Sequence, residues 1–447
     1  MYKLSNYNYF VPYLGRTIFF NGLSGHIFST SEKEYQFLQK QFADPISFKL
    51  QYNSVFNKFK EWGFIIEEQK DELDVIRLRN RKEVFGNKNY HLVINPTLEC
   101  IFKCWYCYEK HPKGYMSEPT INLVKKHIQW MVDNERIDGL HLGWFGGEPL
   151  MYFNKVMVPI AQYAMELMKE QKLPFEHHVT TNAFLINSKM VDKFLELNIN
   201  SFQITIDGDE KRHNMIRNIN GRPTFQKIMD NINLLCERIP AVHVVLRINY
   251  DNDTLEQSNL DVVFSMIHQA YRKNITINYQ RVWQTGGKTT DYDKRIYWQK
   301  LSDKLGFNPC YISNIFSVNK GYTCYVDKVY HTEINYDGKI FKCTARDYSD
   351  KYVKGTLQND GRIEWNNDML SQQYGKATFE NKMCLACKHL PICNGPCSQK
   401  LMETPLESYE SICSLKSSEI MPESFIIDLY EKKMKSINEK SEIGALD

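Results

Sequence analysis

Three cysteines lie together in one short loop, as Cys100, Cys104 and Cys107 with the spacing C-x3-C-x2-C. Thiolates at this spacing can bind three corners of a four-iron cubane cluster and leave the fourth iron without a protein ligand. An open iron could bind a chelating cofactor, just as catalytic zinc sites keep one position open. The alternatives are a zinc loop that lacks its fourth ligand, or reduced cysteines with a structural role.

The other cysteines crowd into the C-terminal part of the chain. Of 12 cysteines, none occurs in the first 99 residues, and Cys236 lies in an amphipathic run where we expect it to pack as a small apolar residue. The C-terminal set is Cys310, Cys324, Cys343, Cys384, Cys387, Cys393, Cys397 and Cys413. In a reducing compartment such clustering indicates metal binding rather than disulfides. A zinc ribbon is the alternative to iron–sulfur clusters here.

Other residues suited to ligand binding follow strand-like segments. They are Gly146-Gly147-Glu148-Pro149, Thr181-Asn182, and Thr205 with Asp207 and Arg217. Glycines let a ligand approach the backbone, and a carboxylate can accept hydrogen bonds from an ammonium group. Taken singly, each has a structural explanation, such as a turn or a helix cap. We expect His213 to be structural, while Arg247 and Asn249 could line the same pocket.

The elements that position these residues alternate between strand and helix. Six candidate strands are separated by helix-length amphipathic segments: 91–95, 140–145, 175–180, 201–206, 243–249 and 275–280. This order predicts an α/β fold with a parallel sheet, either open or a partial barrel. In parallel barrels the working residues lie at the carboxyl ends of the strands, which is where the motifs fall.

The two ends of the chain differ in pattern from this middle part. Residues 1–85 predict a small winged-helix-like unit, with two strands joined by an Asn-Gly turn in 16–30, helices near 31–43 and 52–62, and a strand at 64–68. Short hairpins and most of the cysteines begin near residue 310. The last 30 residues or so predict a surface helix.

Composition excludes several functions. The formal charge of +3 over 447 residues and the absence of a basic strip argue against nucleic acid as a main partner. No apolar run has membrane-spanning length, and the N-terminus lacks an export signal, so we expect no membrane partner and a cytoplasmic location.

The cysteine loop after the first strand, with the motifs that follow, resembles the radical S-adenosylmethionine (SAM) superfamily. The resemblance implies a partial (β/α)6 TIM-type barrel and reductive cleavage of SAM to a 5′-deoxyadenosyl radical by a catalytic 4Fe-4S cluster. It places Tyr106 near the adenine, Gly146-Gly147-Glu148-Pro149 at the amino group and Thr181-Asn182 at the ribose. Thr205 and Arg217 would hold the carboxylate, with Asp207 nearby. Ala183 departs from the family pattern, which has glycine there, and Asn214 replaces an aspartate.

The C-terminal cysteines, together with Gly338, resemble the seven-cysteine SPASM domain. The resemblance implies two auxiliary 4Fe-4S clusters and therefore three clusters in all. Cys384, Cys387, Cys393 and Cys413 would complete the distal cluster, and Cys324, Cys343 and Cys397 would hold the proximal one. Cys310 is the candidate for the fourth proximal ligand, and an iron left open to substrate is the alternative.

Residues 1–85 resemble the precursor-peptide recognition element of enzymes that mature ribosomally made peptides, which binds a leader peptide as an added edge strand. A unit that only packs on the barrel is the alternative. The implied domains are 1–85 for the leader, 86–305 for the barrel, 306–420 for SPASM and 421–447 for a C-terminal helix.

The predicted function is a radical SAM peptide maturase that installs a thioether or another side-chain crosslink. An electron donor such as flavodoxin or ferredoxin is implied, and no catalytic base is identifiable. The alternatives are an anaerobic sulfatase-maturating enzyme that forms formylglycine, a peptide epimerase, a small-molecule radical enzyme and a non-catalytic metal-binding scaffold.

Overall fold

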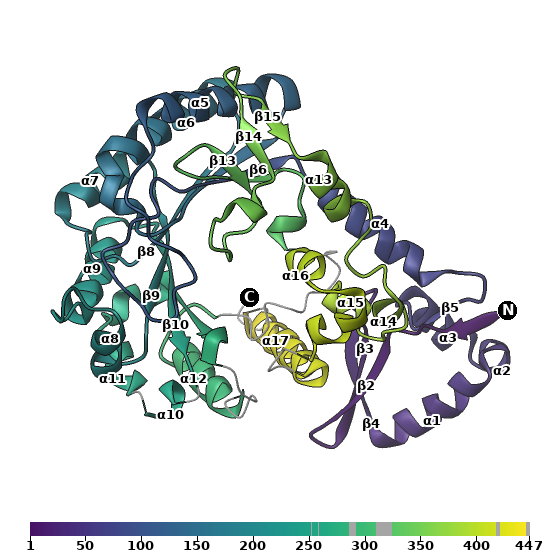
Figure 1. Ribbon diagram of the computed structural model, residues 1–447. Coiled ribbons are helices and arrows are strands. Elements are labelled where there is room, and N and C mark those ends of the chain that lie inside the picture. The colour runs from purple at the N-terminus through teal and green to yellow at the C-terminus, as the bar shows by residue number, and fades with distance from the viewer. Residues whose placement is uncertain (252, 258, 286–291, 310–323, 417–420, 444–447) are drawn as a thin grey trace. The chain divides into compact units, whose positions relative to one another are not determined.

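Figure 1 shows the computed structural model of the chain, which describes all residues except 252, 258, 286–291, 310–323, 417–420 and 444–447. The chain divides into two compact units. One unit contains Lys88–Cys310 and Val329–Ser371, and the other contains Met1–Asn87, Tyr311–Lys328 and Gln372–Asp447. We call them the barrel unit and the terminal unit.

The barrel unit is built on one sheet with the strand order β11-β10-β9-β8-β7-β6-β12-β13-β14-β15. All six predicted strands form, and neighbours among them pair in parallel. Their bounds are β6 (Asn89–Ile94), β7 (Gly139–Trp144), β8 (Phe175–Thr181), β9 (Ser201–Ile206), β10 (His243–Tyr250) and β11 (Ile275–Arg281). The predicted α/β fold with a central parallel sheet is therefore confirmed.

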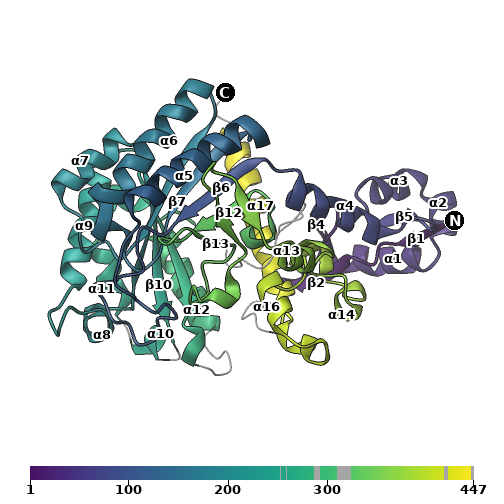
Figure 2. The ribbon, with the colours of Figure 1, turned by 45° about the horizontal axis from the view of Figure 1, so that its top comes forward.

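Helices connect these strands and bury apolar faces against the sheet. They are α5 (Glu118–Trp130), α6 (Val158–Gln171), α7 (Ser188–Glu196), α8 (Glu210–Ile216), α9 (Phe225–Arg238), α10 (Thr254–Gln257), α11 (Leu260–Ser265) and α12 (Tyr292–Lys304). In Figures 1 and 2, α5, α6 and α7 lie on one side of the sheet. Every second side chain of β8 and β9 is buried, which is the pattern of strands that pack one face under helices.

The segment after residue 328 extends the same sheet. β12 (His331–Ile334) pairs in parallel with β6, and β13 (Lys339–Phe341), β14 (Gly355–Leu357) and β15 (Ile363–Trp365) follow in antiparallel order. The segment expected to form the SPASM domain, 306–420, is thus shared between the two units. Its boundaries remain a prediction.

The terminal unit contains two small sheets. β2 (Asn8–Tyr13), β3 (Arg16–Asn21) and β4 (Ile27–Ser31) form a three-stranded antiparallel sheet, and β1 (Tyr2–Leu4) pairs with β5 (Ile65–Glu67). The predicted hairpin is β3–β4, and the side-chain carbonyl of Asn21 accepts hydrogen bonds from the backbone amides of Leu23 and Ser24 in its turn.

The helices of the terminal unit include two that the sequence pattern missed, α2 and α4. The bounds are α1 (Glu32–Ala43), α2 (Pro45–Gln51), α3 (Asn53–Glu61), α4 (Glu72–Phe85), α14 (Lys382–Leu385), α15 (Leu390–Cys393), α16 (Ser398–Glu403) and α17 (Pro422–Ile443), and α13 (Asn367–Tyr374) crosses the boundary between the units. Ser31 caps α1 by accepting from the Glu34 amide, while the Glu34 carboxylate accepts from the Ser31 amide. No helix in the described part of the chain is long and apolar enough to cross a membrane.

Candidate active site

A cavity of about 170 Å³ lies in the barrel unit beside the carboxyl ends of the parallel strands. It gathers most of the residues predicted to bind the catalytic cluster and the cofactor. Those that line it are Cys100, Cys104, Tyr106, Cys107, Gly146, Gly147, Thr181, Asn182, Thr205, Arg217, Arg247 and Asn249. Glu148, Pro149 and Asp207 were predicted for the same site, but they lie behind its wall.

The three cysteines of the loop line the cavity, and the pKa of each thiol is raised. Burial raises the pKa of Cys100 to about 12 and that of Cys107 to about 11, and each is raised further by nearby Cys104. The backbone amide of Phe102 donates to the Cys100 sulfur at 3.4 Å. Among described residues, no three His, Cys, Asp or Glu side chains are arranged to hold a metal ion.

That finding concerns the ligands of a single ion. In a cubane cluster each cysteine binds a different iron atom, so the sulfurs lie further apart than the ligands of one ion. Three thiols in one loop on the cavity wall therefore fit a cluster with one open iron.

Tyr106, Asp207 and Arg217 form a buried network at the cavity wall. The Tyr106 hydroxyl donates to the two Asp207 carboxylate oxygens at 2.6 and 2.8 Å and accepts from Arg217 Nη2 at 2.9 Å. Arg217 Nε also donates to Asp207, and Asn249 Nδ2 donates to the Tyr106 hydroxyl at 3.0 Å. Burial opposes the charge of Arg217, but Tyr106, Cys104 and Asp207 hold its pKa well above the ordinary value. Its charge is thus fixed at the cavity and shared with Asp207.

Glu148 does not face the cavity, although the sequence suggested that it receives an ammonium group. Its carboxylate is fully buried and accepts from the Leu150 amide at 3.0 Å, the Thr181 hydroxyl at 2.7 Å and the Asn182 amide at 2.8 Å. Burial raises its pKa to about 7, although these hydrogen bonds act in the opposite direction. Glu148 therefore ties the end of β7 to the end of β8.

The two glycines before Glu148 bring backbone, not side chains, to the cavity. Gly146 has φ +98°, and a Cβ atom there would lie 2.4 Å from the Thr97 carbonyl. A Cβ on Gly147 would lie 2.2 Å from the Glu99 carbonyl. No side chain fits at either position, so a bound ligand meets peptide groups here.

Asn182 and Ala183 complete this wall after β8. The Asn182 side-chain oxygen accepts from the Phe184 amide, but its Nδ2 is buried and has no partner among the described residues. A ligand oxygen in the cavity would satisfy that donor. Ala183 has φ +61°, a left-handed conformation that favours glycine.

Two buried carboxyls near the site were missed by the sequence analysis. Glu109 lines the cavity, its Oε2 has no partner in the described structure, and burial with a contribution from Glu333 raises its pKa to about 8. Glu333 on β12 accepts from Tyr348 at 2.5 Å and Asn95 at 3.2 Å, and burial raises its pKa to about 7. The sequence could have indicated Glu109, because it lies directly after the cysteine loop, but no feature of the sequence indicates Glu333.

Four C-terminal cysteines come together within the terminal unit. Burial raises the pKa of Cys393 to about 12, with further contributions from Cys384, Cys387 and Cys413. The backbone amide of His389 donates to the Cys387 sulfur at 3.4 Å. These are the four residues predicted for the distal cluster, and their donor set fits one.

The remaining cysteines are distributed over both units. Cys324 and Cys397 belong to the terminal unit and Cys343 to the barrel unit, while Cys310 lies outside the described residues. Cys236 is buried in α9. The proximal ligand set remains a prediction.

Comparisons with known proteins agree with this architecture. Residues 94–258 match the family model of the radical SAM superfamily. The radical SAM cyclopropyl synthase TigE of Paramaledivibacter caminithermalis is 20% identical over 390 residues, covering 77% of this chain and 76% of TigE. A serine-type anaerobic sulfatase-maturating enzyme of Bacteroides thetaiotaomicron is 30% identical over 162 residues, covering 33% of this chain and 37% of that enzyme.

A solved structure resembles nearly the whole chain. The crystal structure of Streptococcus suis SuiB bound to its precursor peptide SuiA has a TM-score of 0.53 at 18% identity, covering 93% of this chain and 100% of SuiB. At this identity the likeness shows a shared fold. The matched segment 94–258 contains the cysteine loop and the motifs after β7, β8 and β9, and the family implies SAM and a 4Fe-4S cluster. The chain therefore contains a radical SAM domain in residues 94–258, and it is an enzyme.

Proposed function

We propose that the protein is a peptide maturase that modifies a ribosomally made precursor peptide. The observation that carries this proposal is the cavity that gathers the three-cysteine loop with the polar groups after β7, β8, β9 and β10. A structural relative suggests the substrate class, since SuiB was crystallised with a precursor peptide. The bond formed in the product is left open, with a thioether or another side-chain crosslink as the prediction.

Cys100, Cys104 and Cys107 would hold the catalytic cluster, which supplies the electron for reductive cleavage of SAM to methionine and a 5′-deoxyadenosyl radical. The chain's own residues bind and orient the cofactor. Peptide groups of Gly146 and Gly147 would meet its amino group, and the free Nδ2 of Asn182 would donate to a ribose oxygen.

The carboxylate of the cofactor would meet the opposite wall. Arg217 provides the positive charge and Thr205 a hydroxyl, and both line the cavity. Asp207 orients Arg217 and Tyr106 from behind that wall.

The proposed leader site on residues 1–85 needs a free strand edge, and β4 is one of the two outer strands of its sheet, β2 being the other. The Asn21 amide donates to the His26 carbonyl, so antiparallel alternation directs the Ile27 and Ser29 peptide groups outward. The Ile27 carbonyl accepts from Lys433 of α17 at 2.9 Å and the Ser29 carbonyl from Arg16 at 3.2 Å. A leader strand added here would have to displace both side chains.

The auxiliary clusters would accept the electron that leaves the substrate radical when a closed-shell product forms. Cys384, Cys387, Cys393 and Cys413 would hold the distal one, and Cys324, Cys343 and Cys397, with Cys310 as the candidate fourth ligand, the proximal one. A flavodoxin or ferredoxin would supply electrons to the catalytic cluster.

The first experiment measures iron, labile sulfide and zinc per chain after anaerobic reconstitution. About twelve iron atoms would support three cubane clusters, while about four iron atoms with zinc would turn the C-terminal cysteines into a zinc module. The reconstituted enzyme is then incubated with SAM, dithionite and the short peptides encoded beside its gene. A mass change in one of them together with 5′-deoxyadenosine supports the proposal, and cleavage of SAM with no peptide modified would contradict it.

A sulfatase-maturating activity is the second candidate, favoured by the 30% identity to the Bacteroides thetaiotaomicron enzyme over 162 residues. The same assay with a synthetic sulfatase peptide distinguishes the two. Conversion of its serine or cysteine to formylglycine, with the neighbouring peptides unchanged, would establish this alternative.

A further inference from the structure

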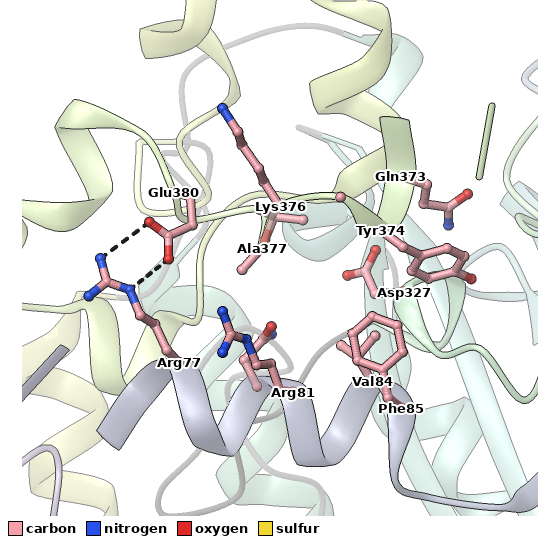
Figure 3. A pocket seen from close by; sticks show the side chains of 13 residues that line it. Arg77, Arg81, Val84, Phe85, Asp327, Gln373, Tyr374, Lys376, Ala377 and Glu380 are labelled. Carbon is pink, nitrogen blue, oxygen red and sulfur yellow. Dashed lines mark hydrogen bonds and ion pairs between the residues drawn. The ribbon is translucent and has the colours of Figure 1, made fainter. Parts of the chain in front are cut away.

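A second cavity, of about 310 Å³, lies within the terminal unit (Figure 3). One face of α4 forms a wall, because the residues involved recur at helical spacing: Arg77, Asn80, Arg81, Val84 and Phe85. The facing wall is the segment 373–378 with Glu380, and Asp327 also lines the cavity. Neither the radical chemistry nor the cluster ligands use any of these residues.

One buried amide in the walls lacks part of its hydrogen bonding. Gln373 is 5% exposed, its Nε2 donates to the Val326 carbonyl at 2.6 Å, and its Oε1 has no partner within the described residues. An unsatisfied buried polar group costs about 1–3 kcal/mol. A ligand for this cavity must therefore bring a hydrogen-bond donor for Gln373.

The charged residues leave an excess of positive charge. Figure 3 shows Arg77 bound to Glu380, at 2.8 and 3.4 Å, and Arg77 also pairs with Asp74. Arg81 and Lys376 have no carboxylate partner in the part of the chain that is described. The remaining acid of the lining, Asp327, is labelled beside Tyr374, away from Arg81. The ligand must therefore also bring an anionic group to the Arg81 side.

Apolar groups form the rest of the lining. Phe85 is 49% exposed, and its ring centroid lies 6.1 Å from that of Tyr374, next to Val84. A simple anion such as phosphate would satisfy the cations but would leave this apolar surface uncovered. A peptide carries backbone N–H donors, a carboxylate side chain and an apolar side chain together.

We propose that this cavity binds a segment of the peptide substrate in which an Asp or Glu side chain lies beside an apolar one. The carboxylate meets Arg81, a backbone N–H donates to Gln373 Oε1, and the apolar side chain packs on Phe85 and Tyr374. Lys376, whose amino group points away from Arg81 in Figure 3, adds positive charge on the facing wall. The inference rests on the proposed function and gives the leader a site apart from the β4 edge, whose outward carbonyls are already bonded.

The test uses the full-length reconstituted enzyme and a display library of random peptides of about twelve residues. The selected peptides are expected to carry an acidic residue next to an apolar one. A fluorescein-labelled selected peptide should bind roughly tenfold more weakly, by fluorescence anisotropy, to Arg81→Glu/Lys376→Glu and to Phe85→Ala. The matched control is Lys33→Glu/Lys40→Glu on α1, two exposed residues outside the cavity, which should bind as wild type does.

Three results would overturn the site: a library that yields no binder, binders that are indifferent to Arg81→Glu/Lys376→Glu, and full competition by inorganic phosphate, which would make it an anion site. The proposed function fails separately. If the selected peptides require Arg81 and Lys376 for binding but no peptide is modified, the binding site is supported and the maturase function is contradicted. If wild type and the double variant modify a peptide encoded beside the gene at the same rate at low peptide concentration, the maturase function is supported and the binding site is contradicted.

Discussion

Asp207 is the carboxylate that balances the positive charge of the SAM cavity, so its replacement by asparagine tests the network directly. The side chains of Asp207 and Arg217 are 2% and 11% exposed. Asp207→Asn keeps the shape but removes the charge that pairs with Arg217. Removing one partner of a buried ion pair costs roughly 3–5 kcal/mol, because the other charge stays buried without compensation. We expect the free energy of unfolding to fall by about that amount.

A double-mutant cycle separates the pair from its surroundings. Arg217→Met alone should also destabilise, while Asp207→Asn/Arg217→Met should lose less than the sum of the single changes, because both charges are gone. Urea unfolding of the apoprotein measures stability, and 5′-deoxyadenosine formation under dithionite measures SAM cleavage, which all three variants should lose. The control, Asp192→Asn, breaks an exposed pair with Arg238 and should cost about 0.5 kcal/mol or less. A loss under about 1 kcal/mol in Asp207→Asn, or additive effects, would refute a buried pair.

Three further changes test the neighbouring residues. Glu148→Gln should lower the free energy of unfolding, measured in urea, by about 1–3 kcal/mol and weaken SAM binding in equilibrium dialysis, because an NH2 group would face the Asn182 amide; unchanged values would contradict the tie between β7 and β8. Ala183→Gly should keep or raise the thermal midpoint, since it relieves a positive φ at a cost in chain entropy; a large drop would show that its buried methyl group dominates. Glu333 has its pKa raised from 4.5 to about 7, so its penalty to stability grows as pH rises from about 4.5 to 7 and then levels off. Glu333→Gln should therefore become more stable relative to wild type over that range in urea titrations, and a flat difference would refute it.

The barrel unit could be predicted from the sequence because its signals are local. Buried residues alternate along strands such as β8 and β9, helix-length amphipathic segments separate the strands, and motifs follow the ends of β7, β8 and β9. The predicted segment 201–206 is β9 itself, and 175–180 falls one residue short of β8. The residues of the site could be predicted for the same reason, because parallel strands bring their carboxyl ends, and the motifs that follow them, to one edge of the sheet.

The terminal unit was harder because its packing involves polar side chains. α4 has four buried residues, Glu72, Ile76, Asn80 and Val84, so half of its core face is polar and no apolar stripe marks it. Glu72 is buried because it accepts from the Ser5 hydroxyl at 2.6 Å and the Asn6 amide at 2.9 Å. Partners nearly 70 residues away in the chain cannot be read from periodicity.

Long-range hydrogen bonds also decide details of the site that the sequence does not show. The identity of Glu148 suggested a ligand group, but its carboxylate is fully buried and already accepts from Leu150, Thr181 and Asn182. Satisfying Glu148 fixes the backbone of Asn182, and that leaves the Asn182 side-chain nitrogen unpaired beside the cavity. Glu148 therefore fixes the backbone at the site, whereas the Asn182 side chain is the group that would contact a ligand. A sequence motif identifies the residues of such a site. The hydrogen bonds that these residues already make in the folded chain decide which of their donor and acceptor atoms are left to bind a ligand.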